Sequence, residues 1–171
     1  MSAPIIDEIL VIDEILAEKG FILADGATGT NLFQRGLETG YPPELWNVER
    51  PDDIISLHTS FLDAGSDLVL TNSFGGNALR LKLHNAQDRV AELNEAAAVL
   101  ARTAVARHRD RHGRAAIVAG SMGPTGELFE PMGALTHDTT RAVFAAQANA
   151  LAEGGVDMLW IETMSSTAEV A

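Results

Sequence analysis

Two acidic residues follow apolar segments near opposite ends of this chain. Asp25 closes the segment FILAD (21–25), and Glu162 lies near the end of DMLWIET (157–163). Two carboxylates that face each other can hold an ammonium group between them or share a proton. The sequence therefore predicts a site for a cation or for acid–base chemistry.

Polar residues in the two middle apolar segments extend this pattern. Thr71 and Asn72 lie in DLVLTNSF (67–74), and Ser121 ends AAIVAGS (115–121). In one segment alone, such a residue more often caps the next helix or turn than binds a ligand. Four segments in succession favour a shared site.

The segment GATGTNLFQRG (26–36) follows Asp25 directly and is expected to be a loop. The backbone N–H groups around Gly26 and Ala27 are suited to receive a carboxylate or a phosphate. The segment has neither the GxxxxGK[ST] nor the GxGxxG arrangement, so nucleotide binding has little support.

Three further features have competing interpretations. His58 lies on an apolar helix face and is expected to be a packed, hydrogen-bonded core histidine. His108 and His112 have the spacing of two metal ligands on one helix face, but arginines surround them, and a metal is not expected there. Trp46 either lines the mouth of a pocket, where its ring would meet a cation, or anchors an ordinary loop.

The elements that must position these residues are predicted by hydrophobic periodicity. Helices are expected at 4–19, from Pro51 to about Gly65, at about 88–110 and at about 138–153, and buried strands at 21–25, 67–74, 115–121 and 157–163. Apolar strands that alternate with amphipathic helices indicate an α/β fold with a parallel sheet. The carboxyl ends of such strands lie on one face, where ligands bind.

Two segments of similar pattern favour a TIM-type (β/α) barrel over a doubly wound sheet. FLDAGSDLVLTNSF (61–74) and LAEGGVDMLWIETM (151–164) each run from a helix end through Gly and Asp to an apolar strand and Thr. A complete barrel has eight strands and about 250 residues. We therefore expect only the first four strand–helix units here, with an open four-stranded sheet as the alternative.

The composition limits the classes of partner. The chain has 171 residues, 46% of them hydrophobic, and a formal net charge of −12 from 24 acidic and 12 basic residues. One soluble, cytoplasmic domain is expected, with no membrane partner, and a nucleic acid would be repelled. The basic cluster between Arg102 and Arg114 is interpreted as a solvated helix end. With no cysteine, the chain has no disulfide, thiolate zinc site or cysteine nucleophile.

Four segments, in order, resemble the homocysteine S-methyltransferase family. They are LADGATGTNL (23–32), GSDLVLTNSFGGN (65–77), VAGSMGPTGE (118–127) and GVDMLWIETM (155–164). The resemblance implies an eight-stranded barrel that moves a methyl group onto the homocysteine sulfur to form methionine. It also implies that residues 1–171 are the N-terminal half of that barrel, with a leading helix in 1–20 and strands 1–4 in 21–171.

The resemblance also implies roles for the polar residues. Asp25 and Glu162 would hold the ammonium group of homocysteine, and the backbone around Gly26 and Ala27 would receive its carboxylate. Thr71, Asn72 and Ser121 would line the same pocket.

Zinc and its ligands are expected outside this chain. In the family, three cysteine thiolates of the second half of the barrel hold a zinc ion that activates the homocysteine thiol. The resemblance thus implies zinc for the complete enzyme, no catalytic residue or metal ligand within residues 1–171, and a C-terminal half or partner chain. The chain would be a truncated piece, a split subunit or an independent half-barrel.

The methyl donor stays open among betaine, S-methylmethionine and a methyl-corrinoid protein, with betaine not favoured because Gly75 and Gly76 supply no aromatic ring. Two other functions are kept as alternatives. One is a non-catalytic binding or assembly subunit, and the other is an unrelated barrel hydrolase that uses Asp25 and Glu162 as an acid–base pair.

Overall fold

A computed structural model describes residues 5–170, with side chains from residue 11 onward. The helices are α1 (Ile5–Lys19), α2 (Thr28–Gln34), α3 (Trp46–Glu49), α4 (Pro51–Ala64), α5 (Ala78–Lys82), α6 (Val90–His112) and α7 (His137–Glu153). The strands are β1 (Leu68–Leu70), β2 (Ile117–Met122) and β3 (Met158–Ile161), and 3-10 turns lie at Pro43–Leu45, Gln87–Arg89 and Thr167–Glu169. The four predicted helices are present, with ends that differ by a few residues.

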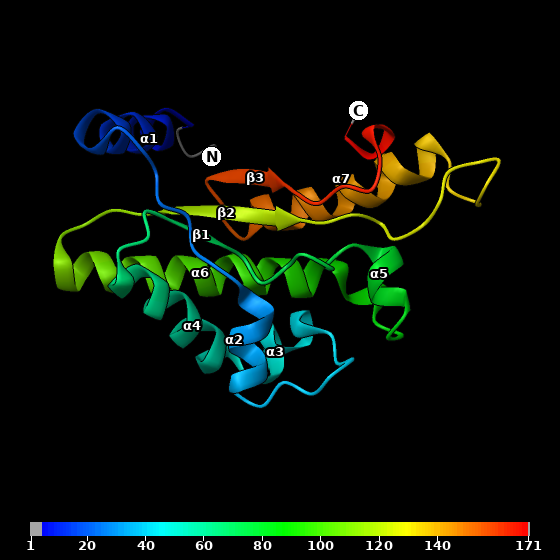
Figure 1. Ribbon diagram of the computed structural model, residues 1–171, viewed down its shortest axis with the longest axis horizontal. Coiled ribbons are helices and arrows are strands. Elements are labelled where there is room, and N and C mark those ends of the chain that lie inside the picture. The colour runs from blue at the N-terminus through cyan, green and yellow to red at the C-terminus, as the bar shows by residue number, and fades with distance from the viewer. Residues whose placement is uncertain (1–4, 171) are drawn as a thin grey trace.

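The three strands form one parallel sheet in the order β1-β2-β3 (Figure 1). Val69 pairs with Val118 across β1 and β2, and Gly120 pairs with Leu159 across β2 and β3. The spatial order of the strands follows their order in the chain, as in a barrel and unlike the reversal of strand order in a doubly wound sheet. The predicted parallel α/β fold is confirmed. Within the described residues the sheet is open, and the barrel is not closed.

The prediction of a strand at 21–25 is wrong, because this segment does not form a full strand. That segment contributes a single parallel bridge, between Ala24 and Leu68. The next ladder hydrogen bond is diverted, because the Leu70 N–H donates to Oδ2 of the Asp25 side chain at 3.0 Å. The side-chain carboxylate thus ends the strand at the residue where chemistry was expected.

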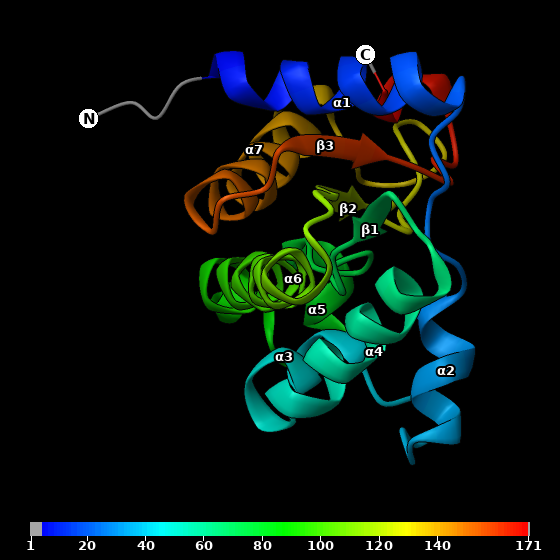
Figure 2. The ribbon, with the colours of Figure 1, turned by 90° about the vertical axis from the view of Figure 1, so that its left-hand side faces the viewer.

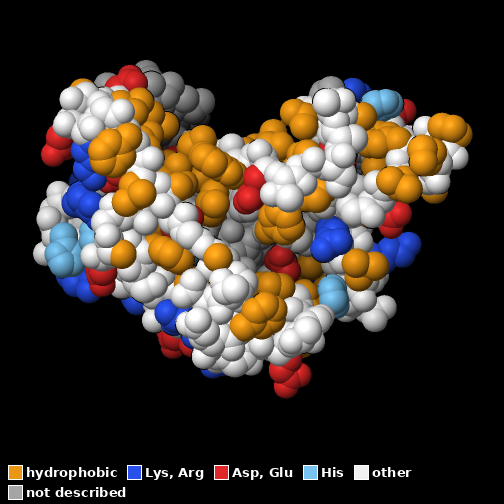
Figure 3. Space-filling model, viewed as in Figure 1, with side chains coloured by type: hydrophobic (Ala, Val, Ile, Leu, Met, Phe, Trp, Pro, Cys, Tyr) orange, Lys and Arg blue, Asp and Glu red, His pale blue; other side chains and the backbone are white. Residues whose placement is uncertain are grey.

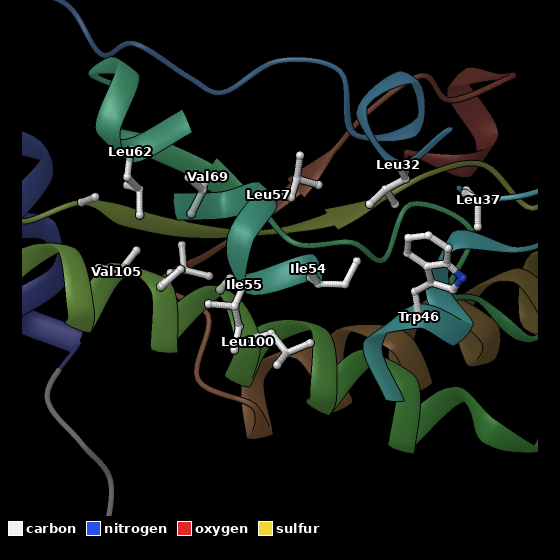
Figure 4. Packing of buried hydrophobic residues seen from close by; sticks show 14 residues of the cluster. Leu32, Leu37, Trp46, Ile54, Ile55, Leu57, Leu62, Val69, Leu100 and Val105 are labelled. Atoms are coloured by element: carbon white, nitrogen blue, oxygen red, sulfur yellow. The ribbon is translucent and has the colours of Figure 1, made fainter. Parts of the chain in front are cut away.

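Different layers cover the two faces of the sheet (Figure 2). Val69 and Val118 belong to the main core, which they form with residues of α4 and α6, among them Leu57 and Leu100 (Figure 4). On the opposite face, α1 packs against a second cluster. That cluster consists of Leu68, Ile117 and Ala119 of the strands, and Val11, Ile12 and Ile15 of α1 are partly buried against it. Burial of each large aliphatic side chain contributes about 1.5–3 kcal/mol.

The predicted loop at 26–36 is wrong in part, since it contains α2. Gly29 and two threonines cost a helix about 2 kcal/mol relative to alanine. Leu32, on the same short helix, is fully buried in the main core, and its burial returns a similar amount. Packing therefore decides the local structure against intrinsic propensity.

The predicted boundaries of α4 are confirmed. Pro51 occupies the first turn together with Asp52 and Asp53, and Gly65 ends the helix with a left-handed φ of 111°. The Gly65 N–H donates to the Leu62 carbonyl at 3.0 Å, as in a glycine C-terminal cap. This sharp end leads the chain directly into β1.

The longest helix, α6, carries Arg109, Arg111 and His112 in its last turn. Cations there complement the helix dipole, as expected for the basic cluster. Among residues 5–170, no helix is long and apolar enough to cross a membrane.

Candidate functional site

A cavity of about 670 Å³ lies at the carboxyl ends of the strands. Its lining includes all the residues predicted to bind the substrate: Asp25, Gly26, Ala27, Thr71, Asn72, Ser121 and Glu162. The space-filling view shows a hollow on this face, with acidic and basic side chains on its walls (Figure 3). The structure thus brings the predicted residues together on one surface.

Asp25 has one engaged and one free carboxylate oxygen. Oδ2 accepts the Leu70 N–H, whereas Oδ1 is buried without a hydrogen-bond partner among the described residues. Burial raises the pKa of Asp25 from 3.8 to about 6; the Leu70 hydrogen bond opposes this shift, and the charge of Glu162 adds to it. A buried carboxylate oxygen without a hydrogen-bond donor is stabilised when a cation lies beside it.

Glu162 is positioned by the end of β3. Its N–H donates to the Met122 carbonyl at 3.1 Å, which continues the pairing of β2 and β3 by one residue. Oε1 accepts the Ser121 hydroxyl at 2.6 Å. Ser121 therefore holds this carboxylate at the cavity, in electrostatic contact with Asp25.

Hydroxyl groups join β1 to β2 beneath the cavity. The Ser73 hydroxyl donates to the Ser121 carbonyl at 2.8 Å, so it accepts from Thr71 Oγ1, 2.6 Å away. Thr71 Oγ1 in turn accepts the Ser121 N–H at 3.0 Å. These bonds replace backbone pairing and explain why β1 ends at Leu70 instead of continuing to residue 74. They also fix Thr71 and Ser121 at the cavity.

Asn72 lines the cavity, but its amide nitrogen is engaged in the protein. Nδ2 donates to the Pro43 carbonyl at 2.8 Å and to Asn47 Oδ1 at 2.9 Å. Asn47 returns a hydrogen bond to the Asn72 carbonyl at 2.9 Å. Asn72 thus anchors the segment around Pro43 that forms the facing wall.

Glu44 is a third cavity acid that the sequence reasoning missed. Its side chain is buried, and Oε1 accepts the Gly75 N–H at 2.7 Å. Burial raises the pKa of Glu44, while its backbone hydrogen bonds and the nearby Arg80 and His84 lower it. The sequence around Glu44 has no hydrophobic periodicity. The one signal that it offers for this residue is an acid directly after Pro42-Pro43.

The cavity rim also contains Tyr41, Phe74, Arg80 and His84, none of which was predicted. Trp46 does not line this cavity. It is 5% exposed in the main core, and the Arg50 guanidinium lies 4.1 Å from its ring centroid. Of its two interpretations, the loop anchor is the one the structure supports.

His58 is packed in the core as predicted, but the expected hydrogen bonds are missing. Its side chain is fully buried, and neither ring nitrogen has a partner within residues 5–170. Burial lowers the pKa of His58 from 6.5 to about 4, so the ring is neutral at physiological pH.

Asp63, His108 and His112 are the one set of described side chains with metal-ligand spacing, with candidate ligand atoms within 4.8 Å of one another. His108 Nδ1 lies 3.2 Å from Asp63 Oδ1, and Arg114 Nη2 lies 3.4 Å from His108 Nε2. Arginine only donates, so the neutral ring accepts at Nε2 and carries its proton on Nδ1, toward Asp63. That assignment uses Nδ1 for a hydrogen bond instead of a metal.

Comparisons with known proteins give a consistent picture. A family model described as homocysteine S-methyltransferase matches residues 22–171. The methionine synthase of Mycobacterium leprae is 33% identical over 158 residues, which cover 88% of this chain and 13% of that protein. The methionine synthase of Mycobacterium tuberculosis is 32% identical over the same shares.

The fold is similar to that of the homocysteine methyltransferase MmuM from Escherichia coli. Its metallated form matches with a TM-score of 0.80 at 24% identity, over 94% of this chain and 59% of that chain. Its oxidized form matches with a TM-score of 0.79 over the same shares. The chain thus spans 13% of the two methionine synthases and 59% of MmuM.

Proposed function

Because the chain belongs to the homocysteine S-methyltransferase family, we propose that its cavity binds homocysteine as the acceptor of a methyl group. The complete protein is then a cytoplasmic enzyme that forms methionine, and this chain supplies the acceptor-binding half of its barrel. Family membership leaves the barrel hydrolase without support.

The ammonium group of homocysteine is held by Asp25 and Glu162. The observation that carries this assignment is the free, buried Oδ1 of Asp25, on the same cavity as the Glu162 carboxylate. An ammonium donor satisfies that oxygen and offsets the repulsion between the two acids. Binding therefore favours ionised Asp25 and strengthens as the pH rises through about 6.

The carboxylate of homocysteine lies against the backbone around Gly26 and Ala27. Both residues line the cavity directly after Asp25, so an anion there is adjacent in the chain to the residue that takes the ammonium. Thr71 and Ser121 form the floor through their hydroxyl network, and Asn72 holds the opposite wall in place.

Zinc, where it is bound, activates the thiol of homocysteine as a thiolate. This chain has no cysteine, so it cannot supply the thiolate ligands that the resemblance implies. The described cavity offers carboxylates, hydroxyls and the His84 ring instead. We place the zinc ligands in the part of the barrel outside residues 1–171.

That remaining part packs against β3 in this proposal. Leu159, Trp160 and Ile161 of β3 are all exposed although they belong to a sheet strand. A mostly apolar groove of about 310 Å³ is lined by Leu159 and Ile161, together with Phe144 of α7 and Met164. Exposed edges of this kind are stabilised by pairing with a further strand.

The test of acceptor binding is titration of the chain with homocysteine, monitored by calorimetry. Asp25→Asn and Glu162→Gln keep the side-chain shapes but remove the charges, and each is expected to weaken binding about 10- to 100-fold. Asp110→Asn, on the exposed surface of α6, is the matched control and should bind as the unaltered chain does. Unchanged affinity in both site variants would contradict the assignment.

Methyl transfer is tested by adding the rest of the barrel. Turnover that needs both parts supports the enzyme. Binding without turnover in any mixture supports instead the non-catalytic binding subunit, the alternative suggested by the absence of thiolates.

A further inference from the structure

The loop between β1 and α5 is held by side-chain amides from three different helices. Each amide belongs to a residue that is at most 3% exposed, and each donates to a different backbone carbonyl of the loop. The pairs are Asn47 Nδ2 of α3 with the Asn72 carbonyl at 2.9 Å, Gln147 Nε2 of α7 with the Ser73 carbonyl at 2.7 Å, and Asn94 Nδ2 of α6 with the Gly76 carbonyl at 2.9 Å. The helices thus fix this loop where β1 has ended.

Gln147 is the member of this set that comes from α7. It is fully buried and does not line the cavity at the carboxyl ends of the strands, whereas Ser73 does. Nε2 of Gln147 also donates to Asn94 Oδ1 at 3.2 Å. Any effect of Gln147 on a ligand in the cavity must therefore pass through the loop that it holds.

The hydrogen-bond network fixes the orientation of the Gln147 amide. Nδ2 of Asn94 faces the carbonyls of Gly76 at 2.9 Å and Val90 at 2.7 Å, which can only accept. Asn94 Oδ1 must then face Gln147, which presents its NH2 group to this oxygen and to the Ser73 carbonyl. Oε1 of Gln147 is left buried without a hydrogen-bond partner in the described part of the chain.

This arrangement indicates that the donor of Gln147 is the part that matters. A buried oxygen without a partner lowers stability, and an apolar side chain of similar shape would avoid that loss but could not donate to the Ser73 carbonyl. The same carbonyl also accepts the Gly76 N–H at 2.9 Å, so the turn at 73–76 closes without Gln147. The amide therefore fixes the position of this turn and does not form it.

Ser73 connects the loop to the carboxylate of Glu162. Its hydroxyl donates to the Ser121 carbonyl at 2.8 Å and accepts from Thr71 Oγ1, 2.6 Å away. The Ser121 hydroxyl in turn donates to Glu162 Oε1 at 2.6 Å. A continuous series of contacts thus runs from Gln147 on α7 to a carboxylate at the cavity.

We propose that Gln147 is a positioning residue for the acceptor amino acid, and that through Ser73 and Ser121 it holds Glu162 where its carboxylate meets the ammonium group. This inference rests on the proposed function. A carboxylate that is already held in place loses less freedom when the ligand binds, so the ligand binds more tightly. A helix that does not contact the ligand then contributes to its affinity.

The test is a double-mutant cycle on the affinity for homocysteine, measured by calorimetry, with urea unfolding of each variant. Gln147→Met keeps the length of the side chain and removes its donors, and it should weaken binding about tenfold. In a Ser121→Ala chain Glu162 has lost its hydroxyl partner, so Gln147→Met should weaken binding there by no more than about twofold. A general loosening of the fold would give equal losses in both backgrounds.

Two further variants of α7 make the test specific. In Gln147→Glu, both groups that faced Nε2 are acceptors and favour the neutral acid, whose O–H donates to the Ser73 carbonyl. This variant should therefore bind homocysteine within about threefold of the unaltered chain. Asn149→Met removes an exposed amide from the same helix and should change neither affinity nor stability.

The outcomes separate this inference from the proposed function. Unchanged affinity in Gln147→Met, equal losses in the two backgrounds, or an equal loss in Gln147→Glu would overturn the inference and leave the homocysteine site in place. If Gln147→Met does not fold, Ser73→Ala removes the hydroxyl link without altering α7, and normal binding by that variant would overturn the inference. Failure of the unaltered chain to bind homocysteine refutes the proposed function and this inference with it.

Discussion

Asp25→Asn is expected to stabilise the protein at neutral pH while it weakens ligand binding. In the folded chain burial raises the pKa of Asp25 to about 6, against 3.8 for the ordinary side chain. The folded state therefore holds the proton more tightly than the unfolded state does. The contribution of Asp25 to stability is fully present below about pH 4 and is lost as the pH rises through about 6.

The size of the effect follows from that difference. The difference between a pKa of about 6 in the folded chain and 3.8 for the ordinary side chain corresponds to about 3 kcal/mol at most. Partial solvent screening of the side chain reduces the expected value to about 2 kcal/mol. Asparagine stays neutral at every pH and keeps an oxygen to accept the Leu70 N–H. Asp25→Asn should therefore match the unaltered chain near pH 4 and exceed its stability by about 2 kcal/mol at pH 7.5.

The assay is urea unfolding at intervals between pH 4 and 8, followed by far-ultraviolet circular dichroism. Asp110→Asn is the control, because this exposed side chain should leave the pH dependence unchanged. A variant of Asp25 that is no more stable than the unaltered chain at pH 7.5, or whose stability falls with pH in parallel with it, would refute the reasoning. The carboxylate would then be better solvated or better paired than its free Oδ1 indicates.

Two further predictions concern other buried groups. Because burial lowers the pKa of His58 to about 4, the contribution of this residue to stability should be fully present above about pH 6.5 and decline by up to about 3 kcal/mol as the pH falls toward 4. His58→Leu should remove this decline in the same unfolding assay. A decline of the same size in the variant would assign it to other groups. Gly75→Ala would bring a Cβ within 2.8 Å of Glu44 Oε1 and should cost about 1–3 kcal/mol through the lost hydrogen bond. Gly29→Ala, where nothing lies within 4 Å of the added Cβ, should be neutral or stabilising in thermal unfolding, and equal losses in both variants would exclude the contact as the cause.

Helices were predictable because one residue pattern determines each of them. Pro51, the acids that follow it and Gly65 mark both ends of α4, and the structure places them there. The short helices α2 and α3 could not be predicted in this way. Leu32 and Trp46 stabilise them through contacts with residues distant in the chain, and these contacts have no local signal.

Strand lengths were overestimated for a different reason. The predicted strand at 67–74 runs through the polar residues Thr71, Asn72 and Ser73 to Phe74, whereas β1 ends at Leu70. The actual ends depend on side chains that accept backbone N–H groups: Asp25 takes that of Leu70, and Thr71 takes that of Ser121. The sequence shows these polar residues but not the hydrogen bonds that they make.

The replacement of backbone pairing by side-chain hydrogen bonds also accounts for the position of the candidate site. A carboxylate or hydroxyl that replaces a ladder hydrogen bond must lie at the end of the sheet, with its remaining oxygen or proton directed away from the ladder. Asp25 uses Oδ2 to end the pairing with β1, and this leaves Oδ1 unpaired beside the cavity. The stability cost expected from its ionisation and its capacity to hold an ammonium group thus have one physical origin. A substitution that removes the stability cost is therefore expected to weaken the binding of the ammonium group.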